Sequence, residues 1–135
     1  MVESTIIYEG DLHCMATHGP SGATIVTDAP KDNQGKGEKF SPTDLVGAAL
    51  GSCILTTMAI VTDRDGIDLK GAYCSVEKEM TAAPRRIAKL TVKIHLPAKL
   101  SENERRKLEH VAHTCPVHRS LHPDVELPIT FEYDL

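Results

Sequence analysis

The sequence predicts a single α+β domain in which antiparallel strands pack on a long buried central helix. An uncharged, helix-like run extends from Leu45 to Val61, and segments with alternating apolar and polar residues lie on both sides of it, separated by turn-forming sequences. A chain of 135 residues is long enough to build one core without cross-links, so we assign residues 1–135 to one domain.

The segment before the central helix has the pattern of a strand pair followed by a loop. Residues 5–15 and 22–28 are predicted strands, and the glycine- and proline-containing residues 17–22 between them predict a turn. Residues 29–39 are polar and contain one proline and two glycines, which is typical of a loop.

The central helix has clear start and stop signals. Ser41 is a good N-cap, Pro42 suits the first helical position, and Asp44 is placed to complete a capping box and to complement the helix dipole. Gly66 is a plausible stop. Cys53 then lies near the middle of a helix of about six turns.

A second hairpin and a second helix are predicted after the central helix. Alternating residues predict strands over 69–78 and 86–95, and a capping box at Ser101 opens an amphipathic helix that extends to about His113. A short turn at Cys115 and a last strand over 127–133 complete the order β-β-α-β-β-α-β.

Composition argues against several classes of partner. The net charge is −4 with both signs scattered, so there is no basic stripe for nucleic acid. Residues 1–5 do not begin a secretory signal, and we expect a cytoplasmic protein. The run 45–61 approaches the length of a membrane span, but glycine, serine and threonine dilute it, so we expect a core helix and no membrane contact.

Two of the four cysteines stand out as a candidate redox pair. Cys53 lies in the apolar helix and Cys115 in a histidine-rich turn, where Pro116 would place Cys115 near the positive end of a short helix. Thiols stay mostly reduced in the cytosol, so a disulfide there is transient and chemical. A thiolate that attacks a peroxide becomes a sulfenic acid, which a second thiol converts to a disulfide. Either cysteine could attack.

The plain alternative is that all four cysteines are packing residues, because free cysteine is among the most buried residue types. For Cys14 and Cys74, which lie in predicted strands, this is the interpretation we adopt. Apolar burial disfavours the thiolate, so a reactive Cys53 needs a nearby cation or hydrogen-bond donor.

Two segments resemble a known family. Residues 40–53, FSPTDLVGAALGSC, are similar to the first-cysteine segment of the OsmC/Ohr family of organic hydroperoxide reductases, and residues 112–118, AHTCPVH, are similar to its second-cysteine segment. The resemblance implies an OsmC-like fold and an intertwined homodimer with active sites at the subunit interface. It also implies that Cys53 is the peroxidatic and Cys115 the resolving residue. The substrate would be an organic hydroperoxide and the reductant an external dithiol, with no bound cofactor.

The chain departs from the family pattern at two activating residues. Characterised members use a glutamate after the proline of the helix start, where this chain has Thr43 and carries its acid one position later at Asp44. They also use an arginine, which in the reductase branch lies in the first hairpin, but no arginine precedes Arg64 here. We expect His18 to replace the arginine, with His13 and Lys39 as the next candidates, and we include Asp44 among the candidate catalytic residues.

The sequence also fits three other functions. Imidazole and thiolate suit zinc, and five clustered candidates are His110, His113, Cys115, His118 and His122. A closed zinc site usually has two Cys-x-x-Cys-like pairs, and this cluster has only one Cys-x-x-His, so we expect metal-free protein. A histidine could instead activate Cys115 for acyl transfer, although no oxyanion hole is recognisable. A third alternative is a non-enzymatic small-ligand-binding protein with an apolar pocket near Cys53.

Overall fold

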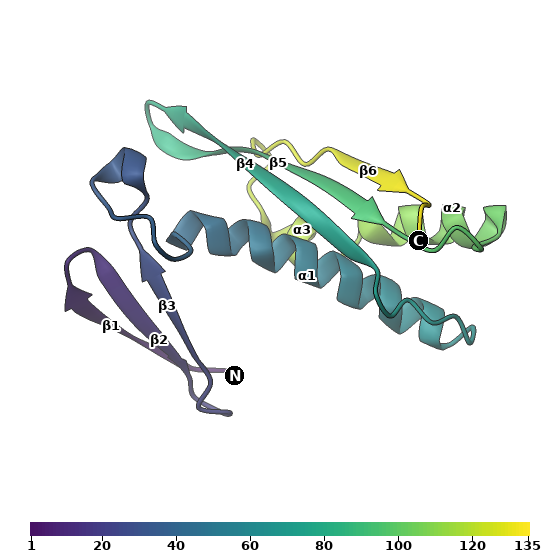
Figure 1. Ribbon diagram of the computed structural model, residues 1–135, viewed down its shortest axis with the longest axis horizontal. Helices are drawn as coiled ribbons and strands as arrows, with labels where there is room; N and C mark the ends of the chain where they lie inside the picture. Colours follow the sequence, from purple (N-terminus) through teal and green to yellow (C-terminus); the bar gives the residue numbers. More distant parts are fainter. The chain divides into compact units, whose positions relative to one another are not determined.

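In the computed structural model, which describes residues 1–135, the chain forms two three-stranded sheets in two units, residues 1–46 and 47–135. The α+β class is confirmed. The elements in chain order are β1 (Ser4–Gly10), β2 (His13–His18), β3 (Thr24–Asp28), a 3-10 turn (Lys31–Asn33), α1 (Pro42–Asp63), β4 (Tyr73–Ala82), β5 (Arg85–His95), α2 (Glu102–Ala112), α3 (Pro116–Ser120) and β6 (Ile129–Glu132) (Figure 1). That the two units form one domain stays a prediction.

The first unit is an antiparallel sheet in the order β1-β2-β3. The prediction of a single strand over residues 5–15 is wrong, because the chain turns back between Gly10 and His13 and forms two strands. Gly10, Asp11 and Leu12 all have positive φ angles of 86°, 53° and 59°, which is the left-handed conformation that a tight hairpin turn requires. Leucine is an unusual residue in that conformation, so the sequence concealed the turn.

The predicted start and end of α1 are confirmed. The backbone N–H of Asp44 donates to Ser41 Oγ at 3.1 Å, and Ser41 N–H donates to Asp44 Oδ2 at 2.9 Å, which completes a capping box. After the last turn, Gly66 has a φ of 71° and Ile67 N–H donates to the Thr62 carbonyl, as expected where a helix ends at a glycine.

The second unit contains a mixed sheet in the order β4-β5-β6. The predicted hairpin of β4 and β5 is present and turns at Ala83-Pro84. β4 begins later than expected because residues 69–72 form a turn with Gly71 at a φ of 91°. β6 pairs with β5 in parallel, which corrects the all-antiparallel prediction. A parallel pair needs a crossover connection, and α2 and α3 provide it.

Within this unit α1 runs alongside the sheet (Figure 1) and approaches β4 closely through two glycines. A Cβ atom on Gly47 would lie 3.3 Å from Val76, and one on Gly51 would lie 2.9 Å from Cys74 Sγ. Apolar side chains from α1, from β5 and the residue after it, and from α2 complete the core. Those with no or almost no exposure are Leu50, Ile54, Met58, Leu90, Val92, Ile94, Leu96, Leu108 and Ala112. The core therefore depends on only one face of α1.

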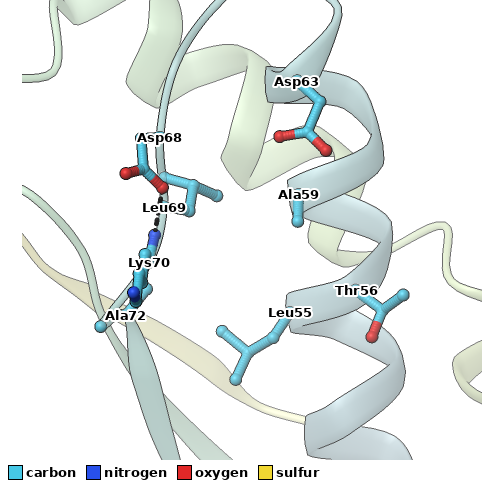
Figure 2. Close-up of a pocket in the computed structure, with 9 residues that line it drawn as sticks. Leu55, Thr56, Ala59, Asp63, Asp68, Leu69, Lys70 and Ala72 are labelled. Atoms are coloured by element: carbon cyan, nitrogen blue, oxygen red, sulfur yellow. Dashed lines mark hydrogen bonds between the residues drawn. The ribbon is translucent and has the colours of Figure 1, made fainter.

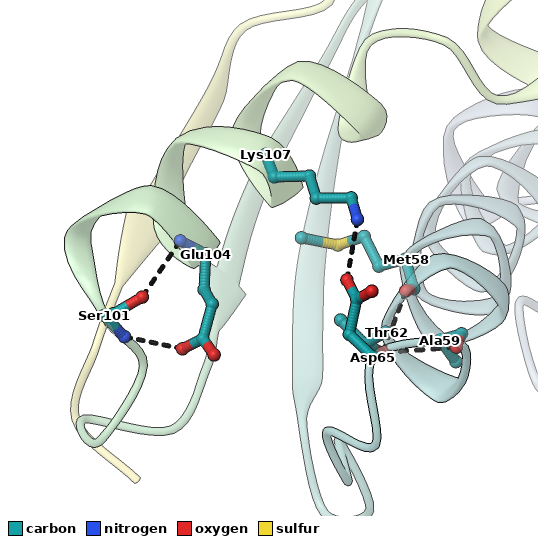
Figure 3. Close-up of polar contacts among 7 residues, drawn as sticks. All are labelled: Met58, Ala59, Thr62, Asp65, Ser101, Glu104 and Lys107. Carbon is teal, nitrogen blue, oxygen red and sulfur yellow. Dashed lines mark hydrogen bonds and ion pairs between the residues drawn. The ribbon is translucent and has the colours of Figure 1, made fainter.

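Polar contacts fix the ends of α1 and α2 (Figure 3). Ser101 Oγ accepts from the Glu104 N–H at 3.2 Å and the Glu104 carboxylate accepts from the Ser101 N–H at 2.7 Å, so the predicted capping box is confirmed. Lys107 Nζ lies 2.6 Å from Asp65 Oδ2, which connects α2 to the segment after α1. Both groups are about half exposed, so this pair adds little stability.

By length and composition α1 is the one helix that could cross a membrane. Six of its residues are nevertheless buried within the fold: Gly47, Leu50, Gly51, Ile54, Met58 and Thr62. This pattern is typical of a core helix.

Close contact between α1 and β4 predicts that Gly51→Ala destabilises the protein. Alanine raises helix propensity by about 1 kcal/mol, but its methyl group would collide with Cys74 Sγ and overpacking costs about 1–3 kcal/mol. We expect a lower free energy of unfolding in urea, with a smaller penalty when the same change is made in a Cys74→Ala background. A net stabilisation by Gly51→Ala would contradict this packing.

Candidate active site

Cys115 occupies the N-cap of the short helix α3. Its backbone is extended and its Sγ accepts a hydrogen bond from the His118 N–H at 3.3 Å, with Pro116 in the first helical position. The predicted position at a helix start is confirmed. The side chain has no exposed surface, so the thiol is fully enclosed by protein.

Cys53 lies in the middle of α1 and meets Cys115. The Cys53 side chain is half-buried, and its carbonyl accepts a hydrogen bond from Thr57 Oγ1 at 2.8 Å. Cys53 lies close enough to the Cys115 thiol to raise its pKa. Two cysteines 62 residues apart in the sequence are thus brought together by α1 and the α2–α3 connection. Both are free thiols here.

The surroundings of Cys115 favour its protonated form. Burial raises the pKa of the Cys115 thiol, and the hydrogen bond and charge of Cys53 raise it further. Backbone N–H groups of His118 and Val117 act in the opposite direction, because they stabilise negative charge at the start of α3. Cys115 therefore keeps its proton beside Cys53.

Two histidines flank this turn. The rings of His113 and His118 meet edge to face with centroids 5.7 Å apart, one on each side of Cys115 in the sequence. Burial lowers the pKa of His118, and the neighbouring charge of His113 lowers it further. The His118 ring is therefore neutral at pH 7.

The five residues considered as zinc ligands do not assemble into a site. No three histidine, cysteine, aspartate or glutamate side chains anywhere in the chain converge in a way that could hold a metal ion. His122 instead pairs with the neighbouring Asp124, with 3.7 Å between Nδ1 and Oδ2.

The expected substitutes for the arginine belong to the first unit, whereas both thiols belong to the second. His18 ends β2, and its Nδ1 lies 2.6 Å from Ser21 Oγ within the turn. Lys39 lies beside a hollow of about 210 Å³ near the β1–β2 turn. Roles of His18, His13 and Lys39 at Cys53 stay predictions.

His13 has a partner that the sequence analysis missed. Its Nδ1 lies 2.6 Å from Asp28 Oδ1, and its Nε2 lies 3.4 Å from Glu9 Oε1. The hydrogen bond from His13 lowers the pKa of Asp28. His13 and Asp28 face each other across the β2–β3 ladder, so the antiparallel register was the signal that could have identified the pair.

Asp44, Cys14 and Cys74 have structural surroundings. The Asp44 carboxylate accepts the Ser41 N–H in the capping box, which confirms its helix-start role and leaves a catalytic role as a prediction. Cys14 is half-buried in β2. Cys74 is half-buried against Gly51, and burial raises the pKa of its thiol.

A separate hollow of about 330 Å³ lies beside the second half of α1 (Figure 2). Leu55, Thr56, Ala59 and Asp63 line it from the helix and residues 68–72 line it from the following turn. Asp68 Oδ1 accepts the Lys70 N–H there at 2.8 Å, which orders the turn. Neither thiol of the pair lines this hollow, so it is not a pocket around Cys53.

Comparison with known proteins defines the class. A sequence model of the family of OsmC-like proteins matches residues 35–130, a range that includes both Cys53 and Cys115. The chain belongs to this family, which confirms the resemblance of the two cysteine segments. No protein of curated function matches it.

Solved structures agree with this assignment. The crystal structure of a proposed osmotic stress induced and detoxification response protein from Psychrobacter arcticus 273-4 is 41% identical, with a TM-score of 0.93 over 98% of this chain and 96% of that one. The organic hydroperoxide resistance protein OsmC of Legionella pneumophila has a TM-score of 0.78 at 17% identity, over 98% and 96% of the two chains. An organic hydroperoxide resistance protein of Elizabethkingia anophelis has a TM-score of 0.76 at 15% identity, over 99% and 96%. The last two show a common fold.

Proposed function

We propose that this protein is a cysteine-based peroxidase that reduces organic hydroperoxides, with Cys53 as the peroxidatic and Cys115 as the resolving residue. The observation that carries the proposal is that Cys53 lies close enough to the Cys115 thiol to raise its pKa, and that both cysteines fall within the residues that the family model matches. Names of similar proteins that refer to detoxification and organic hydroperoxide resistance support a role in peroxide stress.

The chemistry needs only the two thiols and an external reductant. The Cys53 thiolate attacks the distal oxygen of the hydroperoxide, the O–O bond breaks, and the alkoxide leaves as the alcohol after it gains a proton. Cys53 sulfenic acid then reacts with the Cys115 thiol, which forms the S–S bond and releases water. A dithiol reduces the disulfide by exchange and is itself oxidised to a cyclic or linear disulfide. No bound cofactor is required.

His18 and Asp44 complete the proposed site as positioning residues. The rationale is that the family's arginine and glutamate are replaced here, and that a first-hairpin imidazole is the nearest chemical equivalent of the arginine. A cytoplasmic location is part of the same proposal, because a reducing compartment keeps all four thiols free for turnover.

Exposed apolar residues support a homodimer as the working form. Apolar side chains of the first sheet are at least half exposed, namely Ile6, Ile7, Tyr8 and Ile25. The face of α1 that does not contact β4 is uncharged from Ala48 to Ile60, and Ile60 is 53% exposed. Surfaces of this kind are usually covered by another subunit.

Oxidation should join Cys53 to Cys115 within one chain. We expect one equivalent of an organic hydroperoxide to produce this disulfide, detected as a cross-linked peptide pair by mass mapping under non-reducing conditions, and dithiol to reverse it. In Cys53→Ser no disulfide should form, whereas Cys115→Ser should stop at an oxidised Cys53. A bond that involves Cys14 or Cys74, or no bond, would refute the assignment.

A second expectation concerns assembly. Light scattering at micromolar concentration should return twice the mass of the 14.7 kDa chain. Ile60→Glu should weaken this dimer because it would bury a charge in an apolar contact. A monomer at that concentration would contradict the proposal.

A further inference from the structure

We propose that α3 is an acid-opened cover over Cys115. The rings of His113 and His118 pack against each other and hold α3 closed while the His118 ring is neutral, and the helix loosens and exposes the thiol when that ring gains a proton. The opening itself concerns only the reduced protein. Its consequence for turnover, control of access to the second thiol, rests on the proposed function above.

α3 is a weakly anchored element next to a completely buried thiol. The helix has only five residues, Pro116–Ser120, and none of them is fully buried, whereas Cys115 at its N-cap has no exposed surface. Its hydrogen bonds are local: the Arg119 N–H donates to the Cys115 carbonyl at 3.1 Å, and Ser120 Oγ donates to the Pro116 carbonyl at 2.8 Å. Segments with few buried side chains open more readily than the core.

A ring contact joins α3 to the end of α2. His113 is the C-cap of α2 and His118 lies in α3, and their ring centroids are 5.7 Å apart with an interplanar angle of 81°. An edge-to-face pair places the positive edge of one ring on the negative face of the other, which stabilises uncharged rings. Cys115 lies between the two residues in the sequence, and its Sγ accepts the His118 N–H at 3.3 Å. The contact therefore closes the turn that encloses the sulfur.

A proton on His118 has no partner that would balance its charge. Burial lowers the pKa of His118, and the neighbouring charge of His113 lowers it further. The ion pairs that histidines form in this chain involve His13, His95 and His122, so neither ring of the His113–His118 pair has a carboxylate partner.

The other titratable and charged groups of the neighbouring helices do not compensate. On α2, His110 is a further base, and the Glu109 carboxylate is occupied because it accepts the Tyr133 hydroxyl at 2.6 Å. On α3, Arg119 adds positive charge next to His118. From α1, Cys53 acts on the Cys115 thiol and not on the His118 ring. A charged His118 is therefore disfavoured in the closed position.

The direction of the pH effect follows from the lowered pKa. When α3 opens, the His118 ring reaches water and regains its ordinary affinity for protons, so the open form binds protons more tightly than the closed form. The closed form is therefore favoured above the ordinary pKa of 6.5, and this preference is lost as the pH falls below that value through the lowered pKa of the closed form. Acid opens the cover and neutral pH closes it.

Hydrogen exchange in the reduced, full-length protein measures this opening. The readout is the protection factor of the His118 and Arg119 N–H groups, which is corrected for the intrinsic pH dependence of exchange and reports the ratio of closed to open α3. We expect this protection to be at least about threefold lower at about pH 5 than at about pH 7.5. The Ile54 N–H in the core of α1 should keep its protection, which excludes general unfolding. EDTA in all buffers removes metal that could join the two imidazoles.

Matched variants assign the effect to one ring. His118→Gln has no titratable ring, so its α3 protection should be the same at both pH values. His118→Phe, which keeps a flat ring against His113, makes the same test if the glutamine variant does not fold. His113→Gln should reduce the pH effect without abolishing it, because burial is the larger cause of the lowered pKa of His118. His122→Gln is the control, since this ring lies beside Asp124, and it should keep the wild-type pH dependence.

Exposure of Cys115 is the second readout. N-ethylmaleimide forms a stable thioether, and the rate of Cys115 modification is divided by the rate in the urea-unfolded chain at the same pH, so that the pH dependence of thiolate formation cancels. We expect this ratio to rise from about pH 7.5 to about pH 5 in the wild-type protein and to stay constant in His118→Gln. Cys74 in β4 should show no such rise.

Unchanged α3 protection between the two pH values, or a pH effect that persists in both His118 variants, would overturn the proposal. An equal loss of protection at Ile54, or a loss at α3 without faster modification of Cys115, would also overturn it. Acid opening in a protein whose thiols do not react with organic hydroperoxides would support the cover and refute the proposed function. Peroxidase turnover with unchanged α3 protection would do the reverse, so the two proposals can fail separately.

Discussion

Close approach of α1 to β4 is the constraint on which the rest of the second unit depends. Gly51 faces β4 with no room for a side chain. Cys53 follows two residues later, and two residues rotate a helix by about 200°. When Gly51 faces the sheet, Cys53 must therefore point away from it. On that side Cys115 meets it, so packing on one face of the helix determines the chemistry on the other.

The position of Cys115 depends on the crossover between β5 and β6. Because these strands are parallel, the chain must cross back from the end of β5 to the end of the sheet where β5 began before β6 can start. α2 and α3 form this crossover connection. The junction between the two helices is short, and Pro116 starts α3 directly after Cys115. The thiol at this junction is fully buried and still accepts a hydrogen bond from the His118 N–H. Burial and polarity are thus combined at one sulfur atom.

Local signals in the sequence were sufficient for α1, α2 and the presence of the β4–β5 hairpin, but not for the bounds of β4. Caps at Ser41 and Ser101 and the stop at Gly66 each depend on residues within one turn of the helix end, so a short window contains the whole cause. The β1–β2 turn was missed because Leu12 adopts a positive φ that its residue type does not indicate. The parallel pairing of β6 was missed because strand direction depends on contacts with distant residues.

The site could be predicted only in part for the same reason. Two similar segments identified Cys53 and Cys115, and the proline after Cys115 indicated a helix start. That Cys115 is buried close to Cys53, and that the pKa of its thiol is raised there, follows from contacts across 62 residues of chain, which no local pattern records. The pairing of His13 with Asp28 likewise required the register of β2 and β3.

The stoichiometry of a single turnover tests the central claim most directly. Reduced protein, freed of small thiols, is mixed with one equivalent of cumene hydroperoxide per chain, and the free thiols and the alcohol product are counted. A peroxidase with a resolving thiol loses two of its four thiols per chain and releases one equivalent of cumyl alcohol. Retention of all four thiols with the hydroperoxide unconsumed would contradict a peroxidase, and loss of one thiol per alcohol would contradict the role of Cys115 as its partner.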